Sequence, residues 1–329
     1  MPESAARSRR NTVKKRISIA LILLLTMITV GAQAAQYGAM VKNGVKTYSE
    51  KGEEGVVMTW VPRFGEVTVL EYAEDYCRIL YNKSAGYVAT EDLFCFRSHD
   101  PLLYGTPGHV PAVGYVVLTE DVHVDGGDFA GTQAPAGTAV CITALNETEY
   151  IVPVWRSEKA MPASCGEYTP FVPWQDAEPG DVIGGFTTFY GDQQGGELAA
   201  ERENNILRGC ELLNGYVLTK DHLFSFNRIC APYSYYNGYK YAPNIGGNGF
   251  GYGGGVCQVT TTLYNAILPL PMRLRDWCIH QYDGVVYVPQ FFDAAVGDHD
   301  FSYVSKLPYD VRFTACAQNG VLTVLLSRE

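Results

Sequence analysis

The sequence contains no C-x-x-C pair, although its 329 residues include nine cysteines. Zinc knuckles and thioredoxin-type redox sites depend on that spacing, so neither is expected. An odd number of cysteines leaves at least one thiol unpaired even if all the others form disulfides. Most of the nine stand in apolar, strand-like patterns, where cysteine behaves as a small buried hydrophobe, and we expect that role for eight of them. The nine are Cys77, Cys95, Cys141, Cys165, Cys210, Cys230, Cys257, Cys278 and Cys316.

Basic clusters are absent after the first sixteen positions. Residues 1–34 hold six Lys and Arg and one Glu, so 19 basic residues remain against 34 acidic ones, a net charge near −15. Nucleic-acid binding depends on clustered Lys and Arg that contact phosphates. The composition therefore argues against a nucleic-acid partner.

No apolar run is long enough for a standard membrane span. The run from Ile17 to Val30 is about six residues short of the roughly 20 that a spanning helix needs. A basic segment, Arg7–Arg16, precedes it, and Ala32-Gln33-Ala34 follows with the A-x-A pattern of signal-peptidase sites. We expect residues 1–34 to be a cleaved signal peptide, with an uncleaved anchor as the alternative. The protein would then be secreted or associated with the cell envelope, and would touch the membrane only through that segment.

Two stretches before residue 171 favour small β modules. Residues 38–98 contain short strands between turns, with no helical period. Their order of features, from Val45 to Tyr48, then G-x-x-V-x-V-L, then Gly86-Tyr87-Val88, resembles bacterial Src-homology-3-like domains. Residues 113–170 repeat this style more weakly and predict a second, diverged β module. One larger β domain over 38–170 is the alternative.

The character of the chain changes at residue 181. Residues 197–213 predict a helix closed by Asn214-Gly215. A second helix is expected to begin near Cys257 and to end before the prolines at 269 and 271. Strands are expected later, including Val285–Val288. The overall fold class is therefore α+β, with one or two small β-barrel modules before a C-terminal α+β domain over 181–329.

The most informative segment is Gly253–Ala266, which reads G-G-G-V-C-Q-V-T-T-T-L-Y-N-A. Three glycines permit backbone conformations that other residues avoid and allow close approach to a partner. A helix then begins at or just after Cys257. Free backbone N–H groups and the helix dipole at that end favour the thiolate form, which is the nucleophile.

His280 and Asp293 follow Cys257 in the order that a cysteine nucleophile needs. The imidazole would take the thiol proton, and the carboxylate would fix the orientation of the imidazole. Asp283 and Asp300 compete with Asp293 for the third role. The order of the three residues is similar in layout to that of papain-like and transglutaminase-like enzymes, a likeness that concerns arrangement alone.

The segment around Cys257 closely resembles the signature of VanW-type proteins. The resemblance covers roughly residues 183–329 and implies a bacterial envelope setting, an association with glycopeptide-resistance clusters and no assigned reaction. It continues through Leu213–Leu218, Phe224–Asn227, Gly238-Tyr239, His280, Tyr287–Pro289, Asp293–Val296 and Asp300-Phe301. Instead of the Gly-Leu pair usual after the family's helix, this chain has Leu268-Pro269-Leu270-Pro271.

We expect substrate contacts within and near the motif, and Gln258 is a candidate oxyanion donor beside the nucleophile. The residues expected to bind substrate are Gly254, Gly255, Gln258, Thr262, Tyr264 and Asn227. Several tyrosines between Tyr233 and Tyr252 could form a glycan-stacking surface, although loop packing is the more ordinary role. A G-x-G-x-x-G match at residues 249–254 is set aside, because no strand clearly precedes it.

Two functional hypotheses follow. The first is a cysteine enzyme, an amide hydrolase or acyltransferase, acting on peptide or amide bonds of peptidoglycan through Cys257, His280 and Asp293. The second is a non-catalytic cell-wall-binding or scaffold protein in which Cys257 is structural. No cofactor and no metal are expected; a metal site formed by Cys257, His280 and an Asp is a lesser alternative. The expected partners are peptidoglycan or cell-wall peptides.

Overall fold

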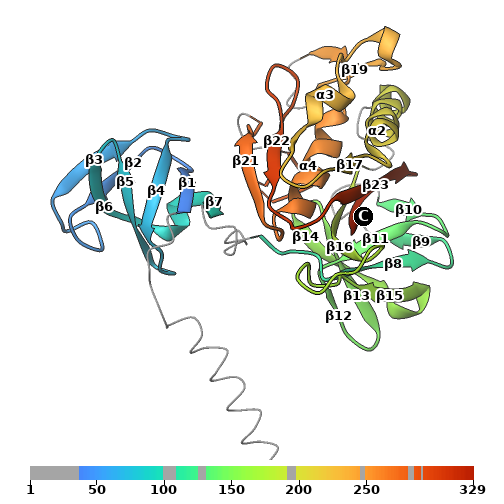
Figure 1. The fold of residues 1–329 in the computed structure, drawn as a ribbon, viewed down its shortest axis with the longest axis horizontal. Helices are drawn as coiled ribbons and strands as arrows, with labels where there is room; N and C mark the ends of the chain where they lie inside the picture. Colours follow the sequence, from blue (N-terminus) through green and yellow to red (C-terminus); the bar gives the residue numbers. More distant parts are fainter. Residues whose placement is uncertain are drawn as a thin grey trace, which may run out of the picture.

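The computed structural model describes residues 37–98, 109–124, 131–190, 198–244, 249–280, 285–289 and 292–329. The expected signal peptide at residues 1–34 lies outside the described residues. The chain is mostly β, with few helices and several small antiparallel sheets (Figure 1).

The N-terminal unit is one seven-stranded antiparallel sheet in the order β3-β2-β6-β5-β4-β1-β7. Its alternating apolar residues, such as Val67 and Val69 in one strand and Cys77 and Ile79 in the next, form a small core of their own. The likeness to Src-homology-3 domains stays a prediction. The strands are β1 (Tyr37–Val41), β2 (Val45–Tyr48), β3 (Val57–Val61), β4 (Glu66–Glu71), β5 (Tyr76–Tyr81), β6 (Ser84–Ala89) and β7 (Leu93–Ser98), with a 3-10 turn at Thr90–Asp92.

The middle unit contains three small antiparallel sheets, β10-β9, β11-β8-β15 and β12-β13-β14. Its core is continuous with the last third of the chain, because Phe189 and Val321 belong to the same cluster of buried side chains. Its strands are β8 (Gly114–Leu118), β9 (Val122–Val124), β10 (Thr132–Ala134), β11 (Ala139–Ile142), β12 (Ala144–Leu145), β13 (Glu149–Val154), β14 (Ser157–Pro162) and β15 (Gly166–Pro170), with a 3-10 turn at Ala163–Cys165.

The last third is built on the antiparallel sheet β16-β24-β23-β17. Sheets β18-β22-β21 and β19-β20 complete it, and Figure 1 shows the helices grouped together. Its strands are β16 (Val182–Phe189), β17 (Val217–Leu218), β18 (Leu223–Ser225), β19 (Tyr241–Pro243), β20 (Phe250–Tyr252), β21 (Met272–Asp276), β22 (Ser302–Ser305), β23 (Val311–Gln318) and β24 (Val321–Arg328). Its helices are α2 (Ala199–Leu213), α3 (Phe226–Cys230), α4 (Val256–Ile267) and a 3-10 turn at Tyr235–Asn237.

The main sheet lies between helices and the middle unit. Helix α4 contacts β16 and β24, and helix α2 contacts β23. Strands β11 and β13 of the middle unit contact β16. Polar contacts cross this second junction: the backbone N–H of Cys141 donates to Thr187 Oγ1 at 2.8 Å, and Thr323 Oγ1 donates to the carbonyl of Ala139 at 2.7 Å. The middle unit is therefore packed against the sheet that supports α4.

His109 connects the segment before the middle unit to the core around α4. Its ring lies 6.1 Å from the ring of Phe186 and 5.5 Å from that of Phe292, centroid to centroid. Its Nε2 atom is buried and has no hydrogen-bond partner. Burial lowers the pKa of His109 to about 4, against a smaller opposing effect of Asn265.

One predicted strand is wrong. Residues 285–289 form a turn rather than the strand expected at Val285–Val288. The carbonyl groups of Val285 and Val288 accept hydrogen bonds from the guanidinium of Arg156, at 2.8 and 3.3 Å, instead of pairing with a strand. Val285, Tyr287 and Val288 are buried although Val286 is exposed, so the segment has a strand-like composition without forming a strand.

Candidate functional site

Helix α4 is buried along its whole length except at Cys257. A helix buried on every side is normally apolar, but this one carries Gln258, three threonines and Asn265. Most buried polar groups find a partner inside the protein, although Thr260 Oγ1 and Asn265 Oδ1 have none in the described part of the chain. Thr262 Oγ1 donates to the carbonyl of Gln258 at 2.7 Å, and Asn265 Nδ2 donates to the carbonyl of Phe292 at 2.8 Å. Cys257 is therefore the one partly exposed side chain of α4, and it lies at the N-terminal end of the helix.

Glycines shape the approach to the N-terminus of α4. Gly255 caps the helix with φ +110°, a conformation that L residues rarely adopt. A Cβ at Gly255 would lie 2.9 Å from the carbonyl oxygen of Arg202, and one at Gly254 would lie 2.5 Å from that of Pro243. Asn205 Nδ2 donates to the carbonyl of Gly254 at 2.9 Å. The glycine run thus lets the loop before α4 lie directly against α2 and β19.

Gly255→Ala is expected to destabilise the protein by about 2–4 kcal/mol, because positive φ and the overlap with Arg202 add together. Gly180→Ala is the matched control, since Gly180 has φ +95° but no atom within 4 Å of the position that a Cβ would take. The control should cost about 1 kcal/mol. Urea unfolding of both variants measures the difference, and equal losses would show that close packing at Gly255 is unimportant.

His280 and Asp293 form a buried hydrogen-bonded pair. The Asp293 Oδ2 atom accepts from both the backbone N–H and the ring Nδ1 of His280, each at 2.7 Å. The side chain of His280 is 16% exposed and that of Asp293 is 1% exposed. Two hydrogen bonds to one carboxylate oxygen fix the imidazole both in position and in orientation.

The pKa of His280 reflects two opposing effects. Burial alone lowers it, but hydrogen bonding to Asp293 and to Cys257 outweighs burial and raises the pKa of His280 to about 10. The imidazole is therefore protonated at neutral pH, which is the state that would partner a thiolate.

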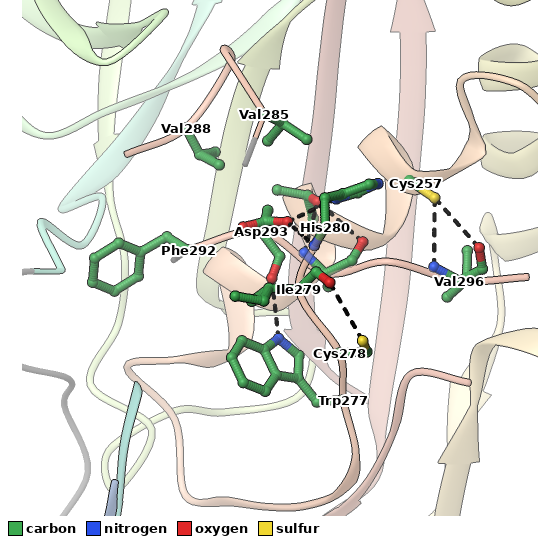
Figure 2. A network of polar contacts seen from close by, with 12 residues as sticks. Cys257, Trp277, Cys278, Ile279, His280, Val285, Val288, Phe292, Asp293 and Val296 are labelled. Carbon is green, nitrogen blue, oxygen red and sulfur yellow. Dashed lines mark hydrogen bonds and ion pairs between the residues drawn. The ribbon is translucent and has the colours of Figure 1, made fainter. Parts of the chain in front are cut away.

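The sulfur of Cys257 lies beside this pair and against the backbone of Val296 (Figure 2). The backbone N–H of Val296 donates to Sγ at 3.4 Å, and the thiol lies 3.5 Å from the carbonyl oxygen of Val296. In Figure 2 the imidazole of His280 lies between the carboxylate of Asp293 and Cys257. Because Cys257 begins a helix and His280 and Asp293 come from two later segments, the fold brings together three residues that are far apart in the chain.

Cys257 and His280 open onto a cavity of about 320 Å³. The glycine run Gly253–Gly255 and the segment Ala295–Asp298 both line it. Tyr233, Asn244 and Tyr252 complete the lining. A cavity of this size, which holds a thiol, an imidazole and the side chain of Asp298, is suited to a small segment of a larger substrate.

Five of the six residues predicted to bind substrate divide into two groups. Gly254 and Gly255 line the cavity. Gln258, Thr262 and Tyr264 are fully buried and face the protein interior, so they lie away from the cavity. Gln258 accepts from Arg202 at 2.9 Å and donates to Thr188 at 3.1 Å, which commits its side chain to structural bonds rather than to an oxyanion.

Asn227 supports the cavity from behind. Its Nδ2 donates to the carbonyl of His299 at 2.8 Å, and its Oδ1 accepts from the hydroxyl of Tyr233 at 2.6 Å. Asn227 therefore joins two parts of the site, the segment after Val296 and the Tyr233 wall. Asn227 itself does not line the cavity.

The two competing carboxylates are placed differently from Asp293. Asp300 accepts from Ser225 Oγ at 2.6 Å and from the backbone N–H of Asn227 at 2.9 Å, so it holds the start of α3. Asp283 lies outside the described residues. The pairing of His280 with Asp293 is the one that the structure shows.

Sequence reasoning missed the groups that touch the thiol and the groups that hold the loop after His280. Val296 contacts Cys257 through its backbone, which leaves no trace in residue type. Arg156 lies at the tip of the β13–β14 hairpin, where it and Trp155 have φ of +63° and +47°. Neither is a residue that such a turn favours. Their side-chain contacts, Arg156 with Val285 and Trp155 with the carbonyl of Phe189, explain their presence.

The described residues show no group of three or more His, Cys, Asp or Glu side chains arranged to hold a metal ion. Eight cysteines are described with their side chains and all are free thiols: five are buried, Cys257 and Cys278 are partly exposed, and Cys316 is exposed. Within the same part of the chain, no helix combines the length and the apolar character of a membrane span.

Comparison with known proteins identifies the region that carries the site. Residues 201–327 match the family model described as VanW like protein. This stretch is a VanW-like domain. It contains Cys257, His280 and Asp293, and it covers α2 to β24 but leaves β16 outside.

One curated relative of this chain is "Uncharacterized protein YoaR" of Bacillus subtilis (strain 168). It is 28% identical over 148 residues, which are 44% of this chain and 47% of the relative. The chain thus spans about half the length of the curated relative that it matches. That relative carries no assigned activity in its name.

Two solved structures show weak similarity to this chain. "Structure of NlpC2 from Trichomonas vaginalis" has 13% identity and a TM-score of 0.17, covering 58% of this chain and 62% of that one. "Structure of NlpC1 from Trichomonas vaginalis" has 12% identity and the same TM-score, covering 91% and 94%. Scores this low make neither structure a template for the fold of the VanW-like domain.

Proposed function

We propose that the VanW-like domain is a cysteine-dependent amide hydrolase or acyltransferase, with Cys257 as nucleophile, His280 as general acid and base, and Asp293 as the residue that orients His280. One observation supports this most strongly. The partly exposed thiol at the head of the buried helix α4 lies beside an imidazole that Asp293 holds at 2.7 Å, and both open onto one cavity.

The proposed reaction is cleavage of an amide through a thioester on Cys257. The Cys257 thiolate attacks the carbonyl carbon of an amide, and the electron pair of the C=O bond moves to oxygen. Protonated His280 then gives its proton to the departing nitrogen, the C–N bond breaks and a thioester remains on Cys257. Water, or an amine in the transfer reaction, attacks the carbonyl carbon of the thioester while His280 takes a proton from it. The C–S bond breaks, the carboxylic acid or the new amide leaves, and the thiolate of Cys257 and the protonated imidazole of His280 are restored.

The developing oxyanion would be stabilised at the N-terminus of α4. The backbone N–H of Cys257 belongs to the first turn, whose amides have no acceptor within the helix. The positive end of the helix dipole lies at the same place. A backbone donor takes the role that the sequence assigned to Gln258, whose amide is occupied by Arg202 and Thr188.

The substrate class that we propose is a peptide or amide bond of peptidoglycan. Its support is the VanW-like domain and the signal peptide expected at residues 1–34, which together favour an extracytoplasmic setting at the cell envelope. The net charge of −10 disfavours polyanionic substrates.

The test is the pH dependence of iodoacetamide alkylation at Cys257, read by peptide mass spectrometry. The exposed thiol of Cys316 serves as a reference within the same molecule. At pH 6 we expect Cys257 to react at least about ten-fold faster than Cys316, because the protonated imidazole of His280 lies beside its sulfur. His280→Ala should abolish this advantage, and His222→Ala, which removes an exposed histidine, should keep it.

A Cys257 thiol that stays unreactive until the protein unfolds would contradict the enzyme proposal. The binding-module hypothesis would then be the better one, and the cavity would be a ligand site without chemistry.

A further inference from the structure

The short ribbon formed by β19 and β20 carries three aromatic side chains on one face. Its register pairs Tyr241 with Tyr252 and Pro243 with Phe250, so these four residues share a face, because directly opposed residues point the same way. Ala242, on the other face, is fully buried. The ribbon therefore packs against the protein with its small residue and presents its rings outward.

The rings are exposed and ordered against one another. Tyr241, Phe250 and Tyr252 are 53%, 53% and 47% exposed. The rings of Tyr241 and Phe250 are nearly parallel, at 19° with centroids 6.0 Å apart, and Tyr241 meets Tyr252 edge-on at 5.6 Å. Contiguous exposed aromatic surface of this kind is uncommon on soluble proteins and marks interaction sites.

This aromatic ribbon is continuous with the cavity. Tyr252 lines the cavity as well as belonging to the ribbon, and Asn244, directly after β19, lines it too. The chain then runs from Tyr252 through Gly253–Gly255 to Cys257. A ligand lying on the rings would therefore extend directly toward the thiol.

The ribbon offers stacking surfaces and neutral polar groups. Its described residues, 241–244 and 249–252, include no charged side chain. Tyr hydroxyl groups and the Asn244 amide supply hydrogen-bond donors and acceptors. Flat rings with neutral polar groups around them match a pyranose, whose C–H face is apolar and whose edge carries hydroxyl groups.

We propose that the aromatic ribbon binds a neutral saccharide chain, and so holds the glycan to which a peptide substrate is attached. The placement of the peptide at Cys257 rests on the proposed function, whereas binding of the saccharide does not. A polyanion would require basic residues that the ribbon lacks, and an anionic membrane surface would require the same.

The probe for the test is N-acetylchitohexaose, a neutral oligosaccharide without peptide, titrated into the full chain by isothermal calorimetry. We expect Tyr241→Ala and Phe250→Ala each to weaken binding about ten-fold, and Phe250→Leu to weaken it as well, because leucine keeps apolar bulk but not a flat ring. Tyr236→Ala is the matched control: this ring is 98% exposed and lies outside the ribbon.

Cys257→Ala should bind the oligosaccharide as the wild type does. Thermal unfolding of each variant shows whether it is folded. We expect the variants to fold, because the replaced rings are about half exposed. Absence of binding by the wild type would overturn the saccharide proposal even if Cys257 is reactive. Equal loss in Tyr236→Ala and in the ribbon variants would also overturn it. Binding with an unreactive Cys257 would instead refute the enzyme and leave the saccharide site standing.

Discussion

Asp293→Asn is expected to lower the turnover of purified cross-linked wall peptides by about 10³- to 10⁴-fold, the size of effect seen when an orienting carboxylate in a triad becomes an amide. In this protein the carboxylate accepts from the backbone N–H and from Nδ1 of His280, and it keeps the imidazole protonated. The amide is nearly isosteric, so the loss would reflect charge and tautomer rather than shape. Release of new amino groups over time measures the turnover.

The same substitution has a pH signature in stability. Because the pKa of His280 is raised from 6.5 to about 10, its pairing stabilises the fold fully below pH 6.5, and that contribution is lost as pH rises toward 10. The wild type should therefore exceed Asp293→Asn by on the order of 3 kcal/mol at pH 6 and by much less at pH 10. Urea unfolding at the two values measures this.

Asp300→Asn is the control for this prediction, since Asp300 holds α3 rather than His280. It should alter stability without a comparable change in turnover. A wild-type level of turnover in Asp293→Asn would show that His280 does not need an anionic partner, and the triad would have to be abandoned.

His109→Phe is expected to remove an acid-sensitive component of stability worth about 3 kcal/mol. The folded protein holds His109 neutral, with a pKa lowered to about 4, whereas the unfolded chain protonates it near pH 6.5. The unfolded state thus binds more protons between these values, so wild-type stability falls as pH falls from 6.5 to 4. Phenylalanine fills the site between Phe186 and Phe292 and does not titrate.

The measurement is the free energy of unfolding of both proteins at pH 7.5, 6, 5 and 4.5. The remaining titratable groups affect both proteins alike, so the difference between the two curves isolates the contribution of His109 to the free energy of unfolding. Below pH 6.5 the free energy of unfolding of the variant should rise steadily relative to that of the wild type. His123→Phe, at an exposed position in β9, should give no such divergence. Parallel curves for His109→Phe and wild type would show that folding does not lower the pKa of His109.

The nucleophile, its helix and its two partners could be expected from sequence because each has a local signature. Glycines before a helix start predict the position of Cys257, and the chain order of His280 and Asp293 follows from the chemistry. The burial of Gln258 and Thr262 could not be predicted from the sequence. Their polar side chains predict exposure, and only the tertiary partners Arg202 and Thr188 reverse that expectation.

The turn at residues 285–289 shows a second limit of sequence reading. A run of Val and Tyr predicts a strand by composition, yet the hydrogen-bond partner of its carbonyl groups is Arg156, about 130 residues earlier. Contacts over that separation in sequence are invisible to local patterns. The same holds for the packing of the middle unit against the main sheet, where Thr187 accepts from the backbone N–H of Cys141 and Thr323 donates to the carbonyl of Ala139.

The region that matches the family model is smaller than the region whose strands and helices pack together. The family match begins inside α2, but β24 pairs along its length with β16, from Val182↔Ser327 to Phe189↔Val321, and β16 precedes the match. A fragment cut at residue 201 would leave β24 with an open, apolar edge and would leave α4 without the strand that carries Thr188. Excision at the family boundary should therefore yield an aggregating polypeptide.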